Sequence, residues 1–247
     1  MKETTTSAII MRIREIGESD LLVTFFTPEK GQVRGVAKGA RRSRKRFANC
    51  LETFSLVSLE YSTRKEGGLC LLHSGKLLDA FPALRADFGI LSRAGYMIEL
   101  TEVLFPSGVA EREVFELLKG SLESLARGTA PDLSMLLFEA RALALGGYAI
   151  RTGRCCCCGR SYTGSGTAVF RPDRGGIACL RCQEETANTP PLRPAGVRAL
   201  ENIQEGILCD CGDLTLTDGE IMEIRAVLRL HREYRLERRL KTLRYVE

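Results

Sequence analysis

Two pairs of cysteines with the same internal spacing constrain this chain more than any other feature of its sequence. Two residues separate Cys155 from Cys158 and Cys179 from Cys182, and 20 residues lie between the pairs. Structural zinc is bound by four such ligands in a tetrahedron, commonly from two C-x-x-C turns. The pattern C-x2-C-x20-C-x2-C is typical of zinc ribbons and predicts one structural Zn²⁺ at these four residues.

The sequence around the two pairs needs such a ligand to fold. Residues 153–187 are rich in Gly and Cys and hold few large aliphatic side chains, so a core of their own is not expected. Cys156 and Cys157 then become loop thiols. A redox dithiol and a catalytic metal stay open as alternatives, although four thiolates close the zinc shell and leave no open position for a substrate.

The pattern of the first 80 residues predicts β structure. Short runs of alternating, β-branched or aromatic residues are separated by turn signals such as Thr27-Pro28-Glu29-Lys30-Gly31. Five strands in about 80 residues fit an OB fold, and another small barrel or a meander fits as well. The expected strands are residues 7–13, 21–26, 32–37, 54–61 and 69–77.

Helical periodicity follows from Pro82 and returns after the cysteine-rich stretch, with a last helix expected from about Asp218 to the basic end of the chain. Charged residues interrupt every apolar run before bilayer length, so no transmembrane helix is expected. The fold class is therefore α+β and multidomain. The expected parts are an OB-fold barrel (1–80), a helical domain in two pieces (81–152 and 188–247) and the inserted zinc ribbon (153–187).

Positive charge is concentrated in the first third of the chain. Residues 1–80 hold 14 Lys or Arg against 9 Asp or Glu, which equals the whole net charge of +5. Residues 38–46, here called the basic segment, hold six of these cations. Such a run attracts phosphates without reading sequence, but a solvated loop or nonspecific RNA binding is the alternative. The expected DNA contacts are Arg34, Lys38, Arg41, Arg42, Arg44, Lys45 and Arg46. Phe47, Phe54 and Tyr61 are candidates for base stacking, although alternation makes Phe54 equally a core residue.

The last 23 residues carry eight Lys or Arg and an apolar side, as in a basic amphipathic helix. Such a helix can offer cations to DNA or to an acidic peptide, or simply pack with a solvated face. The candidate contacts are Arg235, Arg238, Arg239 and Lys241.

In this order of parts the chain resembles the bacterial RecO family of recombination mediator proteins. The resemblance rests on residues 27–31, 36–42, 147–148, 155–159, 175–182 and 239–242. It implies a non-enzymatic protein of DNA repair that binds single- and double-stranded DNA and anneals complementary strands. It also implies RecR and the acidic tail of single-stranded DNA-binding protein as partners in loading RecA. A signal peptide is not evident at Met1–Thr6, so a cytoplasmic, nucleoid-associated protein is expected.

Two other functions stay open. An RNA-binding protein with an OB fold and a zinc ribbon has the same composition. A zinc or thiol enzyme would use Cys156 or Cys157.

Overall fold

The computed structural model describes residues 2–63, 68–128, 130–206, 216–236 and 239–246. Contacts divide the chain into two compact units. Unit 1 comprises Met1–Gly128 together with Thr242–Glu247, and unit 2 comprises Thr129–Lys241. The chain thus leaves unit 1, builds unit 2 and returns to unit 1. This grouping cuts across the segment 81–152 that the sequence suggested as one helical part.

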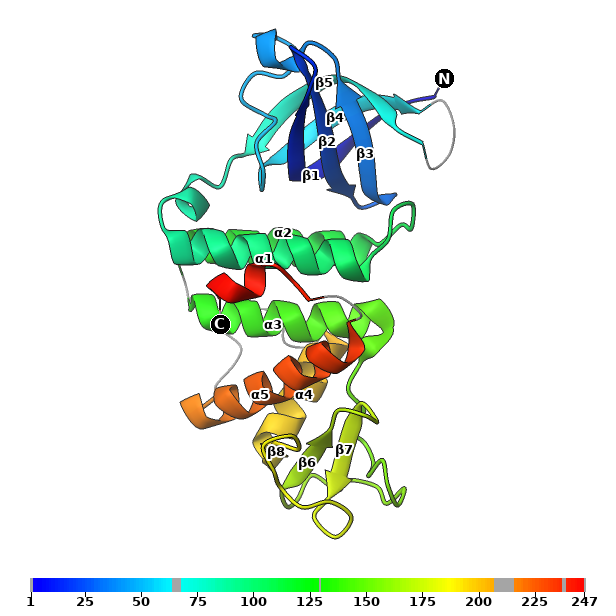
Figure 1. Ribbon diagram of the computed structural model, residues 1–247, viewed down its shortest axis with the longest axis vertical. Coiled ribbons are helices and arrows are strands. Elements are labelled where there is room, and N and C mark those ends of the chain that lie inside the picture. Colours follow the sequence, from blue (N-terminus) through cyan, green and yellow to red (C-terminus); the bar gives the residue numbers. More distant parts are fainter. Residues whose placement is uncertain (1, 64–67, 129, 207–215, 237–238, 247) are drawn as a thin grey trace. The chain divides into compact units, whose positions relative to one another are not determined.

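The five N-terminal strands form a closed barrel in which neighbouring strands follow the order β1-β2-β3-β5-β4 (Figure 1). The β3–β5 pair is parallel and the other four are antiparallel. All five expected strands are present, with longer bounds at most ends. They are β1 (Lys2–Ile16), β2 (Asp20–Thr27), β3 (Gly31–Ala37), β4 (Leu56–Thr63) and β5 (Cys70–Asp79).

The barrel interior follows the alternation of apolar residues that predicted the strands. Ala8 and Ile10 of β1 and Val23 and Phe25 of β2 point inward and are fully buried. Gly35 of β3 is required by close packing, because a Cβ there would lie 2.1 Å from Leu72 Cδ1. Side-chain alternation and one tight approach therefore define the interior.

The expected fourth strand begins two residues later than its sequence suggested. Phe54 has a φ of 75°, which no strand residue adopts, and its N–H donates to the carbonyl of Ile10 at 2.7 Å. The Phe54 ring is buried, which explains why an apolar residue occupies this position. The strand prediction was wrong at this residue because a buried turn and a strand carry the same hydrophobic signal.

Unit 1 also contains helices that pack on the barrel and on one another. Helix α2 contacts β2 and α1, and the short C-terminal helix packs on α1. The side chain of Asp87 caps α1 by accepting from the N–H of Ile90. The elements are η1 (Ala40–Arg42), η2 (Pro82–Arg85), α1 (Phe88–Leu104), α2 (Arg112–Arg127) and η5 (Thr242–Tyr245).

In its described residues, unit 2 combines three α-helices with a three-stranded sheet of order β7-β6-β8. Helices α4 and α5 pack on α3, and β8 contacts both α4 and α5. The elements are α3 (Pro131–Leu143), η3 (Ala144–Tyr148), β6 (Ala168–Arg171), β7 (Gly176–Cys179), β8 (Pro191–Leu192), α4 (Pro194–Glu205) and α5 (Asp218–Arg235). None of the described helices is both long and apolar enough to cross a membrane.

The expected basic helix at the end of the chain is shorter than predicted. Helix α5 ends at Arg235, and Leu236 is already extended, with φ −88° and ψ 122°. Further along, Thr242 donates from its backbone N–H and its hydroxyl to Glu99 of α1, at 2.9 and 2.7 Å. The one-helix prediction was therefore wrong. Contacts within unit 1, such as that of Thr242 with Glu99, determine where the last residues lie. The helical periodicity of the sequence carries no information about such contacts.

Candidate metal centre and nucleic-acid interface

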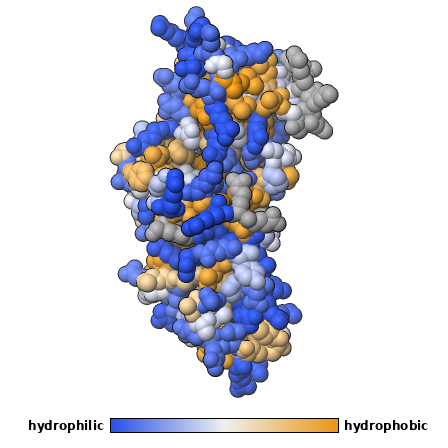
Figure 2. Space-filling model, in the orientation of Figure 1, coloured by the Kyte–Doolittle hydropathy of each residue, from blue (hydrophilic) through white to orange (hydrophobic). Residues whose placement is uncertain are grey.

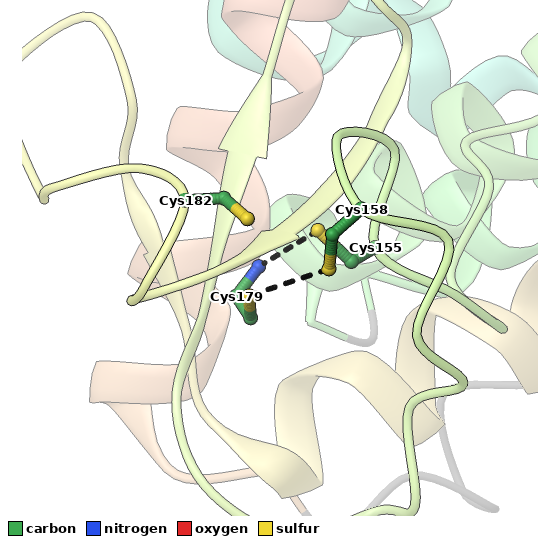
Figure 3. A group of neighbouring side chains, drawn as sticks. All are labelled: Cys155, Cys158, Cys179 and Cys182. Atoms are coloured by element: carbon green, nitrogen blue, oxygen red, sulfur yellow. Dashed lines mark hydrogen bonds between the residues drawn. The ribbon is translucent and has the colours of Figure 1, made fainter.

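Four cysteine sulfurs converge in the cysteine-rich part of unit 2. The Sγ atoms of Cys155, Cys158, Cys179 and Cys182 all lie within 4.8 Å of one another. Figure 3 shows them around one common space, with the Sγ atoms of Cys158 and Cys179 3.9 Å apart. Tetrahedral zinc with Zn–S bonds of about 2.3 Å separates its sulfurs by about 3.8 Å, so adjustments of about 1 Å or less make the residues fit the ion.

Backbone geometry around the first pair explains why these cysteines meet. Gly159 has a φ of 75°, and its N–H donates to the carbonyl of Cys155 at 2.9 Å, which closes a tight turn. The N–H of Cys156 donates to Ile177 of β7, so the turn is held beside the strand that ends in Cys179. On the other side, the N–H of Cys182 donates to the carbonyl of Cys179. Two turns and one strand therefore fix four sulfurs.

The thiols differ in acidity because their hydrogen bonds differ. Burial opposes ionisation of Cys155, but backbone N–H groups, among them those of Cys179 and Cys157 at 3.4 Å, outweigh burial and lower its pKa to about 6. Hydrogen bonds with the sulfurs of Cys179 and Cys158 raise the pKa of Cys182 to about 12. N–H groups aimed at a sulfur favour the thiolate, which is the form that binds zinc.

The apolar core beside the cluster is small. It consists of the buried residues Cys155, Val169 and Ala178, with Cys156 and Cys179 packed against them. The segment buries three further apolar residues, Ala168, Phe170 and Ile177, and six buried residues offset only part of the conformational entropy of ordering a segment of this length. A bound metal is therefore the expected source of the missing stability.

The other cysteines of the described residues do not join the group of four converging sulfurs. Burial raises the pKa of Cys156 to about 11, and its sulfur lies 4.0 Å from that of exposed Cys157. Cys50 and Cys70 are buried in the barrel, where desolvation raises the pKa of each to about 11. Cys209 and Cys211 lie outside the described residues.

The cations of the basic segment lie at one end of the barrel and are all exposed, as is Arg34 on β3. Figure 2 shows hydrophilic side chains gathered over this end, at the top of the view. Glu15 and Glu18, which the sequence analysis did not connect with the segment, lie beside it. They come from the end of β1 and the turn that follows. The strand order β1-β2-β3 could have revealed these two acids, because it places the turn after β1 next to the end of β3.

These acids organise part of the segment. Arg41 pairs with Glu15 at 3.0 Å, and Arg42 pairs with Glu18 at 3.7 Å. Asp20 accepts from the N–H of Gly39 at 2.8 Å and so anchors the start of η1. Tertiary neighbours therefore hold the backbone of this segment in place.

The remaining cations divide into anchored and unpaired ones. Arg46 donates to the carbonyl of Lys38 at 2.6 Å, and its guanidinium lies 5.3 Å from the centre of the Phe47 ring. No ion pair within the described part of the chain involves the side chains of Arg34, Lys38, Arg44 or Lys45. These four are the cations most available to phosphates.

The three aromatic candidates for base stacking lie in the interior. Phe47 and Tyr61 belong to the barrel core, and Phe54 is buried in its turn. Their rings cannot stack on bases without opening the fold, so the stacking prediction was wrong. Alternation makes an inward-facing aromatic and a surface platform look alike in sequence.

The described cations near the end of the chain have different surroundings. Arg235, the last residue of α5, lies against the insert, where a Cβ on Gly175 would be 2.3 Å from its guanidinium. Arg239 and Lys241 are exposed and lie beyond the helix. Arg238 is outside the described residues. As a DNA or partner surface, this set stays a prediction.

A closed barrel with an exposed cationic end and a helical unit with a four-cysteine site define a mixed α+β protein. Two family models together match nearly the whole chain: Recombination protein O N terminal over residues 1–81 and Recombination protein O C terminal over residues 85–244. The chain belongs to the RecO family, as its sequence motifs indicated.

Curated relatives agree with this assignment. A DNA repair protein RecO from Anaeromyxobacter sp. (strain K) is 34% identical over 247 residues, which cover 100% of this chain and 97% of the relative. The DNA repair protein RecO of Desulfatibacillum aliphaticivorans is 36% identical over 251 residues, with the same coverage. That of Syntrophobacter fumaroxidans is 42% identical over 179 residues, covering 72% of this chain and 71% of the relative.

Proposed function

We propose that this protein is a non-enzymatic recombination mediator of DNA repair, which binds single- and double-stranded DNA and anneals complementary strands. The observation that carries the proposal is the exposed, largely unpaired set of cations at one end of the barrel in a chain of the RecO family. Phosphate contacts by Lys and Arg supply affinity that is independent of sequence.

The strand order supports an OB fold as the DNA-binding platform. A closed five-stranded barrel of order β1-β2-β3-β5-β4 has the topology in which the β2–β3 face and neighbouring loops bind oligonucleotides. Arg34 lies on β3, and Lys38 follows directly after that strand. The basic segment therefore extends the face on which a strand would lie.

Annealing follows from charge neutralisation. Two complementary strands repel each other through their phosphates, and binding both on one cationic surface lowers this repulsion. Base pairing then selects the partner strand without any contact from the protein to base edges. A surface with few exposed rings and many cations suits this role.

The zinc site has a structural role in this proposal. Cys155, Cys158, Cys179 and Cys182 would hold one Zn²⁺ in a closed shell, which leaves no position for substrate. The ion would supply folding energy to residues 153–187 and link the turn that holds Cys155 and Cys158 to the end of β7, where Cys179 lies. As the resemblance to the RecO family implies, the chain would work with RecR and the acidic tail of single-stranded DNA-binding protein to load RecA in the nucleoid.

One experiment tests the core of the proposal. Binding and annealing of labelled strands are measured against salt, and zinc content is determined on the same sample. We expect one zinc per chain, affinity that falls steeply with salt, and annealing faster than that of free strands. Equal-length RNA is the competitor, and its preferential binding would favour an RNA-binding protein. Failure to bind either nucleic acid would refute the proposal.

A further inference from the structure

Exposed aromatic rings are scarce in unit 1, and the two that exist touch each other. Nine of its eleven Phe and Tyr residues are buried. The exceptions are Phe88, whose residue is 67% exposed, and Tyr245, which is 46% exposed. Their ring centres are 5.7 Å apart with the planes at 90°. Two residues that are 157 positions apart in the sequence thus form one exposed aromatic surface.

A cation completes this surface. The guanidinium of Arg244 lies 4.5 Å from the centre of the Tyr245 ring and is exposed. An arginine beside a ring offers a second stacking plane and donors for a phosphate oxygen. We call Phe88, Arg244 and Tyr245 the aromatic platform.

The platform is held in place by polar contacts beneath it. Buried Glu99 accepts two hydrogen bonds from Thr242, at the start of η5, and Leu243 is buried. Phe88 is the first residue of α1, whose start is fixed by the Asp87 cap. The rings are therefore presented by two anchored helical elements, so little ordering entropy remains to be lost on binding.

We propose that the aromatic platform stacks unpaired bases of single-stranded DNA. This inference rests on the proposed function and adds to it a site outside the barrel. Phosphate contacts at the basic segment serve single and double strands alike, whereas exposed rings select strands whose bases are free. The barrel itself offers no exposed ring among its described residues. The aromatic platform therefore supplies a preference for single-stranded over double-stranded DNA, which the cations of the basic segment do not.

The size of the platform favours bases over a folded protein partner. At 67% and 46% exposure, two rings of about 200 Å² each offer roughly 230 Å². A stable protein interface buries about 800 Å² on each partner, several times more. One or two bases match the available area, and the adjacent guanidinium matches their phosphate.

A tryptophan reporter tests stacking directly. The chain contains no Trp, so Tyr245→Trp introduces a single fluorophore on the platform. We expect its emission to be quenched by an oligothymidylate of about 16 nucleotides, the upper site size of one OB fold. An abasic strand of equal length should leave the emission unchanged. The matched control is Val109→Trp, which places the same reporter at an exposed apolar residue of unit 1, away from any ring pair.

Affinity gives a second readout. Phe88→Ala and Tyr245→Ala should each weaken binding of the oligothymidylate about tenfold, since stacking contributes a 5- to 150-fold factor per base. Binding of a duplex of equal length should not change. Unfolding transitions of these variants report whether they keep the wild-type fold, which is expected because both side chains are exposed.

The outcomes separate this inference from the proposed function. If the wild type binds both DNA forms but the reporter is not quenched and the Ala variants bind normally, the platform is refuted and DNA binding stands. If the wild type binds no DNA, both are refuted. If a free acidic peptide quenches the reporter and oligothymidylate does not, the surface serves a peptide and the stacking inference is wrong.

Discussion

The four unpaired cations lead to a quantitative prediction of salt dependence. Each phosphate contact contributes about −0.9 to the slope of log affinity against log salt for duplex DNA. If Arg34, Lys38, Arg44 and Lys45 each bind one phosphate, the wild-type slope is about −3.6. Raising salt from about 50 to about 200 mM should then weaken duplex binding about 150-fold.

Two matched double variants separate available cations from paired ones. Arg44→Gln/Lys45→Gln removes two unpaired charges, so the slope should fall to about −1.8 and the same change of salt should weaken binding only about 12-fold. Arg41→Gln/Arg42→Gln removes two charges that Glu15 and Glu18 already neutralise, so its slope should stay near that of the wild type.

Fluorescence anisotropy of a labelled duplex across a salt series measures these slopes. Both variants change the same number of charges in neighbouring residues, so general loss of positive charge affects them equally. Equal slopes for the two variants would refute the argument that local ion pairs decide which cations bind phosphate. A wild-type slope near zero would remove the whole basic segment from the mechanism.

Three further outcomes are expected. A zinc chelator should make residues 153–187 sensitive to protease while the barrel stays resistant, and Cys156→Ser/Cys157→Ser should keep one zinc; limited proteolysis and metal analysis check both. Glu139→Leu should destabilise the protein by about 3–5 kcal/mol, because it breaks the buried ion pair with Arg232 at 2.8 Å, and adding Arg232→Met should recover most of the loss in denaturant unfolding. Burial lowers the pKa of His231 below its ordinary 6.5, so the unfolded chain takes up a proton at a higher pH than the folded chain. The free energy of unfolding should therefore fall by up to about 1.4 kcal/mol per pH unit as the pH drops below 6.5. His231→Gln should flatten this pH dependence in unfolding titrations.

The parts of the fold that local chemistry determines were predictable from sequence. Alternation located all five barrel strands, and the spacing of Cys155, Cys158, Cys179 and Cys182 selected the sulfurs that the structure brings together. A strand face or a two-residue turn is set within a few residues, so its pattern survives in the linear sequence.

The parts that depend on distant neighbours were not predictable. The pairing of Arg41 with Glu15 crosses 26 positions of sequence and depends on barrel closure. Likewise, the end of α5 and the burial of Phe47 depend on elements that lie far away in the chain. Residue type gives the charge or the ring, but only tertiary contacts decide whether that group is available to a ligand.

The return of the chain to unit 1 has a consequence for biosynthesis. Glu99 of α1 is made early, but Thr242, which donates two hydrogen bonds to it, follows the whole of unit 2. At roughly 5–20 residues per second, the ribosome needs about 7 to 29 s to translate from Glu99 to Thr242, which lies 143 residues further on. During that interval α1 leaves the ribosome without η5, and its surface is open to chaperones or to other chains. The unit whose synthesis begins first is thus the last to be completed.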